Sequence, residues 1–351
     1  MFIFEIITAI WFFVFGSVIG SFMNVVVYRT PRGKSIVGSS RCPQCDHAIR
    51  WHDNIPILGW FLLKGKCRDC SLPISFRYPT VEFVTACLFL VLAIAELYSG
   101  GANLPGYGGT AAPGFSGLIA DMDWKADEHW MVVRVYVLHV LLVSTLFCWA
   151  LICVDDQRVP TVQIGALWLI GFAASAIWPD IHPLSFTGQP TGSGDVALQW
   201  GGFQTAVFGF LAAGMVYLCW TALERYVVPQ MTTEANTSDA ANTAFCAGIG
   251  SIGIILGWQA VVSILFLTAL SRGIFTLSGF RSARLRATPL LIDMLVATVI
   301  HVCFWSRLWQ LPSWPGAGSG WAALLGVGIA LLVLTFSAPL SLDSCDGERG
   351  A

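Results

Sequence analysis

Long apolar segments separated by short polar ones are the main pattern along the chain. An α-helix rises about 1.5 Å per residue, so about 20 apolar residues are needed to cross the roughly 30 Å of hydrocarbon in a bilayer. The pattern predicts membrane-spanning helices near residues 4–27, 80–98, 133–154, 161–178, 203–222, 243–278, 287–306 and 320–341.

The segment 243–278 is too long for one span and short for two. It has no charged residue from Ala244 to Ser271, and an arginine-rich stretch follows it. A single span would place those arginines outside the cell, against the tendency of basic residues to stay on the cytoplasmic side. We therefore predict a tight hairpin that turns at "LGWQ", residues 256–259. The chain then has nine spans and a cytoplasmic C-terminus.

The first apolar segment, "MFIFEIITAIWFFVFGSVIG", has the position of a signal peptide. It lacks a basic start and a small-residue cleavage site, and its apolar stretch continues to about residue 27. We interpret it as a retained span with its N-terminus outside. The composition agrees with a membrane protein, because 56% of the residues are hydrophobic and only 11% are charged.

Charge indicates which polar segments are cytoplasmic. Nine of the 19 Lys and Arg residues lie from Arg29 to Arg77, where there are only three acidic residues, and this predicts a cytoplasmic segment. Residues 99–131 are rich in glycine and acidic, as expected of a flexible loop outside the membrane. Residues 179–202 contain no Lys or Arg and are predicted to lie outside as well.

These observations predict an all-α polytopic membrane protein of about eight or nine transmembrane helices, with a small cytoplasmic zinc-ribbon-like domain between the first two spans. The expected parts are a first transmembrane helix (1–27), a cytoplasmic four-cysteine zinc domain (28–79), a second transmembrane helix (80–98), a Gly-rich periplasmic loop (99–131), a transmembrane core (132–341) and a C-terminal tail (342–351).

Four of the 11 cysteines form two pairs in the basic segment, "CPQC" and "CRDC". Two such pairs suit a structural zinc ion, which would replace the hydrophobic core that about 50 residues can hardly build. The alternative is a pair of disulfides, but a cytoplasmic location disfavours them. The basic residues are explained by topology and anionic lipid, so we do not predict nucleic-acid binding. The predicted ligands are Cys42, Cys45, Cys67 and Cys70.

Several motifs in this region carry a family resemblance. "GSFMNVVVYRTPRGKS", "CPQC", "RWHDNIPILGWFLLKGKCRDC" and "PISFRYPTVEF" follow one another from Gly16 to about Phe83. Together they resemble the N-terminal region of type IV prepilin peptidases. The resemblance implies a bacterial inner-membrane enzyme that cleaves a short basic leader from type IV pilin or type II secretion pseudopilin precursors at the cytoplasmic face. It also implies N-methylation of the new N-terminus with S-adenosylmethionine.

Peptide hydrolysis by carboxylates needs two of them sharing one proton. The family places the first aspartate after a mid-chain span and the second in a GxGD motif. Asp155 and Asp156, in "ALICVDDQRVPTVQ", match the first position, although the stretch to the proline is two residues shorter. Their alternative interpretation is a polar turn between spans.

The second aspartate is missing from the expected position. Alignment on "SIGIILGWQAV" places Phe245 there, and the literal glycine pattern "GIGS" places Ser251 there. Asp239 and Asp293 are the nearby carboxylates that would substitute. Asp239 otherwise starts a helix, and Asp293 otherwise pairs at the headgroups with a neighbouring arginine, Arg284 or Arg286.

Four polar residues near the domain are candidates for substrate binding. Asn24 would bond a substrate backbone or cap its own helix. Arg29 and Arg77 would contact an acidic residue of the precursor or bind lipid phosphates. Glu82, just inside the second span, requires a partner, for which Arg77 and Arg29 are near enough in sequence. His47 and His52 flank the first cysteine pair and are interpreted as surface side chains.

The resemblance therefore predicts an aspartic endopeptidase whose partners are the bilayer, zinc and the apolar helix of a prepilin or pseudopilin precursor, without nucleic acid. S-adenosylmethionine is expected by resemblance alone, because no glycine-rich nucleotide loop is present. The missing second aspartate leaves two alternatives. One is a proteolytically inactive membrane adaptor that binds pilin-like helices, and the other is a methyltransferase without protease activity.

Overall fold

The structure is a computed structural model of the chain. It describes residues 2–42, 44–107, 127–190, 200–227, 235–277, 290–312, 314, 325–326 and 328–329. Within these ranges the regular secondary structure is helical, apart from isolated β-bridges, and turns and loops join the helices. The long helices are α1 (Phe2–Arg29), α3 (Arg77–Ala93, continued by a π-helical turn Ile94–Tyr98), α5 (Asp127–Val154), α6 (Thr161–Ile177), α7 (Gly201–Val227), α8 (Ala235–Leu256), α9 (Trp258–Leu277) and α11 (Leu290–Trp309).

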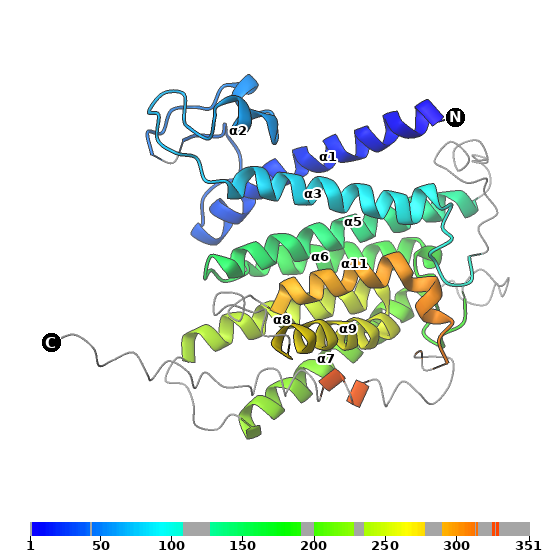
Figure 1. The fold of residues 1–351 in the computed structure, drawn as a ribbon. Coiled ribbons are helices and arrows are strands. Elements are labelled where there is room, and N and C mark those ends of the chain that lie inside the picture. Colours follow the sequence, from blue (N-terminus) through cyan, green and yellow to red (C-terminus); the bar gives the residue numbers. More distant parts are fainter. Residues whose placement is uncertain are drawn as a thin grey trace.

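The long helices lie side by side in one bundle, and a small domain projects from one end of it (Figure 1). This four-cysteine domain, residues 28–79, leaves the bundle where α1 ends and returns where α3 begins. We call this end of the bundle the domain end and the opposite end the far end. The helix pairs with the most extensive contacts are α1 with α3 and α7 with α8.

Among the described residues, five helices are long and apolar enough to cross a membrane: α1, α3, α5, α7 and α11. Shorter apolar helices occupy Thr161–Ile177, Asn242–Leu256 and Trp258–Ile274. Side chains on the outside of the bundle are apolar as well, as expected of a surface that faces lipid. The predicted class, an all-helical multi-pass membrane protein, is therefore confirmed. The expected last span, 320–341, lies almost entirely outside the described residues, as do 108–126 and the C-terminal tail.

The break within segment 243–278 occurs where the sequence predicts it. Helix α8 ends at Leu256 and α9 begins at Trp258, with Gly257 between them. Gly257 has a φ of 88°, a conformation that side chains disfavour and glycine adopts freely. Because α8 and α9 run in opposite directions, Arg272 near the end of α9 returns to the end of the bundle from which α8 begins (Figure 1).

Two pairs of buried polar side chains join neighbouring helices inside the bundle. Glu96, in the π-helical turn after α3, lies 2.5 Å from Nδ1 of His139 on α5. His301 on α11 lies 2.7 Å from the hydroxyl of Ser263 on α9. All four residues are buried, and such pairs avoid the cost of leaving polar groups unsatisfied in an apolar medium.

Glycine permits the close approach of α7 and α8. A Cβ atom added at Gly209 would lie 1.9 Å from the carbonyl oxygen of Gly253, and one added at Gly253 would lie 2.2 Å from the carbonyl oxygen of Gly209. No side chain fits there, so the two backbones touch directly. Small residues at crossings of this kind let membrane helices pack by van der Waals contact.

We predict that Gly209→Ala forces α7 and α8 apart and destabilises the protein by about 1–3 kcal/mol, the usual cost of overpacking. The matched control is Gly214→Ala on the same helix, where an added Cβ meets no atom within 4 Å. It should leave the stability unchanged or raise it, because alanine favours helix. The measurement is the apparent melting temperature in detergent. An equal response of the two variants would show that the crossing is not tightly packed.

Candidate functional site

The two cysteine pairs fold into similar loops. The amide of Cys42 donates to the carbonyl of His47, and the amide of Asp46 donates back to the carbonyl of Cys42. The second loop repeats this pattern, with Cys67 donating to Leu72 and Ser71 donating back to Cys67. The residue after each pair has a positive φ, 56° at Asp46 and 60° at Ser71. Each pair is therefore held by a turn of the kind that zinc knuckles use.

The four sulfurs converge on one point. The Sγ atoms of Cys42, Cys45, Cys67 and Cys70 all lie within 4.8 Å of one another. Sulfurs around a tetrahedral zinc ion at about 2.3 Å stand roughly 3.8 Å apart, and the distance from Cys42 Sγ to Cys70 Sγ is 3.9 Å. These cysteines are free thiols. The group thus fits a metal such as zinc, and the fit does not require His47 or His52.

A cleft of about 350 Å³ separates the four-cysteine domain from the membrane helices. Helix α1 contributes Ser21 and Asn24 to its lining, and α3 contributes Tyr78 and Glu82. Two short elements of the domain close the other side: the 3₁₀ turn Trp51–Asp53 and helix α2 (Leu58–Leu62). The cleft therefore joins the cysteine loops to the ends of the membrane-crossing helices.

Asp53 and Arg68 form a two-bonded ion pair in the cleft lining. Nε of Arg68 donates to Oδ2 of Asp53 at 2.7 Å, and its Nη2 donates to Oδ1. The guanidinium lowers the pKa of Asp53 below its usual value. Neither Asp53 nor Arg68 was among the residues predicted from the sequence for the site. The signal was the arginine between Cys67 and Cys70, which the second loop carries toward the first.

Glu82 has a different partner from the arginines expected for it. Its Oε2 accepts a hydrogen bond of 2.6 Å from the amide of Ile57, the residue before α2. The backbone at Ile57 has φ 63° and ψ −58°, which is unusual for a β-branched residue. The expected pairing of Glu82 with Arg77 or Arg29 is therefore wrong. Its carboxylate binds the four-cysteine domain to α3.

Asn24 and Arg29 are used within the protein. The side-chain amide of Asn24 donates to the carbonyl of Tyr78 at 3.2 Å, which joins α1 to α3 rather than capping α1. The guanidinium of Arg29 donates to the carbonyls of Ser35 and Ser39 in the loop that leaves α1. Neither contact tests a role in substrate binding.

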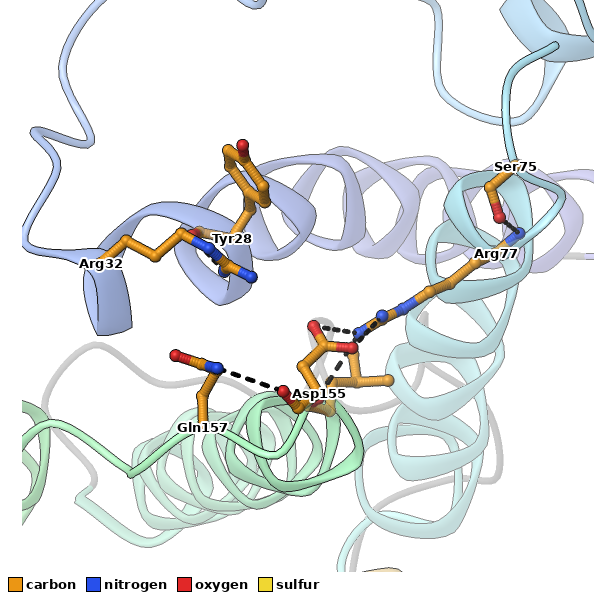
Figure 2. A network of polar contacts seen from close by, with 7 residues as sticks. Tyr28, Arg32, Ser75, Arg77, Asp155 and Gln157 are labelled. Carbon is orange, nitrogen blue, oxygen red and sulfur yellow. Dashed lines mark hydrogen bonds and ion pairs between the residues drawn. The ribbon is translucent and has the colours of Figure 1, made fainter. Parts of the chain in front are cut away.

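Arg77 and Asp155 form an ion pair between the start of α3 and the end of α5 (Figure 2). One guanidinium nitrogen donates to Oδ1 and the other donates to Oδ2 at 3.0 Å. The carbonyl of Asp155 also accepts from the side chain of Gln157 at 3.3 Å. Arg32 lies nearby and donates to the carbonyl of Tyr28 at the end of α1. Asp155 therefore joins the end of α5 to the start of α3.

Asp156, the other candidate for the first catalytic position, follows directly in the turn. It has a φ of 53° and is exposed. The two aspartates at the end of α5 therefore have different environments. Asp155 is oriented by an arginine, whereas Asp156 faces away from the protein.

The candidates for the second carboxylate also lie toward the domain end. Asp293, in the first turn of α11, pairs with Arg272 near the end of α9, with 2.8 Å between Oδ2 and Nη1. Both side chains are buried. Asp239 lies early in α8, but its side chain is outside the described residues. Asp293 thus has an arginine partner as expected, but that partner is Arg272; Arg284 and Arg286 lie outside the described residues.

Neither position that the resemblance assigns to the second aspartate is available for acid chemistry. Phe245 is buried in α8, with its ring centroid 5.7 Å from that of Trp220. Ser251 is fully buried further along the helix, donates to the carbonyl of Ala247 and accepts from Nε1 of Trp168. An aromatic cluster therefore occupies the place of the expected carboxylate.

Comparison with known proteins finds relatives that are named as prepilin leader peptidases. The family model of the bacterial peptidase A24 N-terminal domain matches residues 14–95. A type 4 prepilin-like proteins leader peptide-processing enzyme of Escherichia coli O78:H11 is 33% identical over 204 residues, which cover 52% of this chain and 71% of the relative. A prepilin leader peptidase/N-methyltransferase of Myxococcus xanthus is 51% identical over 82 residues, covering 23% and 24%. No solved structure matches.

The fold and site define a multi-pass membrane protein with a four-cysteine domain between its first two spans. The chain belongs to the type IV prepilin leader peptidase family. The match to the Myxococcus relative spans only about a quarter of that protein's length, and a match to a relative of the same name from Klebsiella pneumoniae spans 38%. The family model itself covers the four-cysteine domain and most of its two flanking helices, residues 14–95.

We predict that the purified protein contains about one zinc ion per chain, because four thiolates form one tetrahedral site. Cys45→Ser and Cys67→Ser should each reduce the zinc content severalfold and destabilise residues 28–79. Cys219→Ser is the matched control, since Cys219 is exposed on α7 and far along the chain from the group. Zinc is measured by elemental mass spectrometry. Unchanged metal content in the first two variants, or disulfides linking these cysteines, would contradict the assignment.

Proposed function

We propose that the protein cleaves the basic leader of type IV pilin or pseudopilin precursors at the cytoplasmic face of the bacterial inner membrane. The observation that carries this proposal is the placement of the candidate carboxylates. Asp155, Asp156, Asp239 and Asp293 all lie on the domain-end portions of their helices, the end that also bears the cleft. The relatives named as leader peptidases support the substrate class.

The orientation follows from charge. The four-cysteine domain contains nine of the 19 basic residues, and basic segments beside spans stay in the cytoplasm. We therefore assign the domain end to the cytoplasm. A precursor inserted in the same membrane with its basic leader inside would present the cleavage site at the level of Asp155.

The proposed chemistry uses one carboxylate as a base toward water and a second, protonated one to polarise the scissile carbonyl. Asp155 is the better first member, because Arg77 orients its two oxygens while its side chain remains 23% exposed to water. Asp239 is the better second member. Asp293 is already paired with Arg272 in a buried site, and breaking such a pair costs about 3–5 kcal/mol.

A second candidate function is precursor recognition without cleavage. The specific observation in its favour is Phe245, buried against Trp220 where the resemblance expects the second aspartate. The four-cysteine domain and its cleft are complete in this chain, so binding or methyl transfer would survive the loss of proteolysis. The two functions differ in a single measurable step, the appearance of the shortened precursor.

The precursor helix would lie against an apolar hollow of about 520 Å³ between α1, α3 and α5. Trp11, Phe15 and Ile19 of α1 line one side, and Val137 and Val140 of α5 line the other. This surface is almost entirely apolar, as a helix that remains in the bilayer requires. It lies toward the far end of the same helices α3 and α5 that Arg77 and Asp155 join at the domain end.

The polar cleft under the four-cysteine domain is the proposed place for the methyl donor S-adenosylmethionine. When bound there, this cofactor would supply a methyl group to the new N-terminal amine. The lining offers the carboxylate of Glu82, the Asp53–Arg68 pair and the amide of Asn54 as polar contacts. The resemblance and the relatives' N-methyltransferase names support this part of the proposal.

We predict that membranes containing the wild-type protein shorten a pilin-like precursor, and that Asp155→Asn and Asp239→Asn each reduce the rate by about 10²-fold or more, as expected for a lost acid or base. Asp156→Asn should reduce it much less. Cleavage is followed by the mobility and N-terminal sequence of the product.

The matched control is Asp180→Asn, because Asp180 also pairs with an arginine, Arg134, but lies at the far end of the bundle. If wild type leaves the precursor intact while another member of the family cleaves it, the proteolytic proposal fails. Co-purification of the uncut precursor with the wild-type protein would then support the recognition function.

A further inference from the structure

Helix α2 has two unlike faces. Gly59 and Trp60 turn inward: a Cβ at Gly59 would meet the carbonyl of Asp53, and the indole of Trp60 donates to the carbonyl of Ile74 at 2.9 Å. Leu58, Phe61 and Leu62 turn outward, with 59%, 56% and 70% of their surface exposed. Spacings of three and four residues place these three side chains on one side of the helix.

The depth of α2 relative to the bundle is fixed by contacts between α1 and α3. A Cβ at Gly20 of α1 would lie 2.7 Å from the Cα of Glu82, so these residues are level. Asn24 binds the carbonyl of Tyr78 and sets the same antiparallel alignment. Glu82 lies about 7 Å along α3 from Arg77, measured at 1.5 Å per residue. Since the carboxylate of Glu82 accepts a hydrogen bond from the amide of Ile57, α2 begins within one glutamate side chain of that level.

This part of α3 is within a membrane-crossing helix. The apolar span of α3 begins at Arg77, so Glu82 is already within it. Figure 1 shows α2 on the side of the four-cysteine domain nearest α1 and α3, not at the domain's outer edge. The exposed face of α2 is thus continuous with the surface that the spans present to lipid.

Charge at the end of α2 suits the same environment. Lys64 and Lys66 follow the helix directly. A short apolar helix followed by lysines is the arrangement of segments that lie in the membrane interface, with apolar side chains among the acyl chains and ammonium groups at the phosphates. Arg68, the next basic residue, turns away to Asp53.

We propose that α2 is an in-plane membrane anchor, which inserts Leu58, Phe61 and Leu62 into the bilayer leaflet on the domain end while Lys64 and Lys66 contact anionic phospholipid headgroups. The anchor holds the four-cysteine domain against the membrane surface. It thereby fixes the distance between the domain and the spans, and with it the width of the cleft between them. The inference concerns the attachment of the domain and does not depend on the proposed enzyme activity.

The test places the photoreactive residue p-benzoylphenylalanine at Phe61 of the full-length protein, in vesicles of phosphatidylethanolamine and phosphatidylglycerol. After irradiation we expect the peptide containing position 61 to carry the added mass of one phospholipid. The matched control is the same replacement at Val37, which is apolar and 83% exposed. Arg29 lies about 13 Å further out along α1 than Gly20. Val37 lies in the loop that Arg29 holds through Ser35 and Ser39, so it should carry no lipid.

Equal lipid labelling at positions 61 and 37, or none at 61, would overturn the anchor. A crosslink from position 61 to a second copy of the chain would overturn it as well, since the face would then be a protein interface. Zinc content checks that each variant is folded. If the variant at Phe61 does not fold, replacement at Leu62, the most exposed residue of the face, gives the same decision.

Discussion

Arg77 is the residue at which the four-cysteine domain becomes a membrane helix, and its guanidinium binds both oxygens of Asp155 at the end of α5. A charge at this depth requires a partner, because apolar surroundings solvate it poorly. By pairing, the two residues fix where α3 enters the bundle relative to α5. The contacts of Asn24 with Tyr78 and of Glu82 with Ile57 then set the positions of α1 and of the domain.

The four-cysteine domain has very little hydrophobic core of its own. Among the described residues of segment 28–79, Cys42 is the one buried hydrophobic residue, and the larger apolar side chains are exposed or half-buried. A domain of about 50 residues without a core requires another source of stability, which a metal in the sulfur group would supply. The ion pair of Asp53 with Arg68 and the hydrogen bond of Glu82 add fixed points on either side of the cleft.

The helical architecture was accessible from the sequence because apolar length and charge placement act locally. The break at Gly257 is the clearest example, since the arginines after the segment required an extra turn. The convergence of the four cysteines was also predictable, because two CxxC pairs carry their own loop geometry.

The partners of the charged residues were not predictable in the same way. Arg77 and Asp155 are 78 positions apart, and Arg272 and Asp293 are on different helices, so each pairing depends on how the helices pack. Glu82 was expected to bind an arginine, but it accepts a hydrogen bond from the backbone amide of Ile57, which the fold of the four-cysteine domain places beside α3. The distance between two residues along the sequence does not predict such contacts. That each charged residue in or beside an apolar span requires some partner was clear from its position in the sequence.

Phe245 occupies the position of the expected aspartate, and this limits where a second carboxylate can lie. An aspartate inside the contact between Phe245 and Trp220 would be a buried charge without a visible partner, so this part of α8 is built for packing. A second carboxylate, where the protein uses one, must therefore come from nearer the start of α8 or from α11. Asp239 precedes Phe245 by about 9 Å of helix, toward the end of the bundle where Asp155 lies. Under the proposed function, a carboxylate at position 239 would lie closer to water than one at position 245. The two acids would then exchange protons with solvent, and the polar leader of the precursor would remain hydrated.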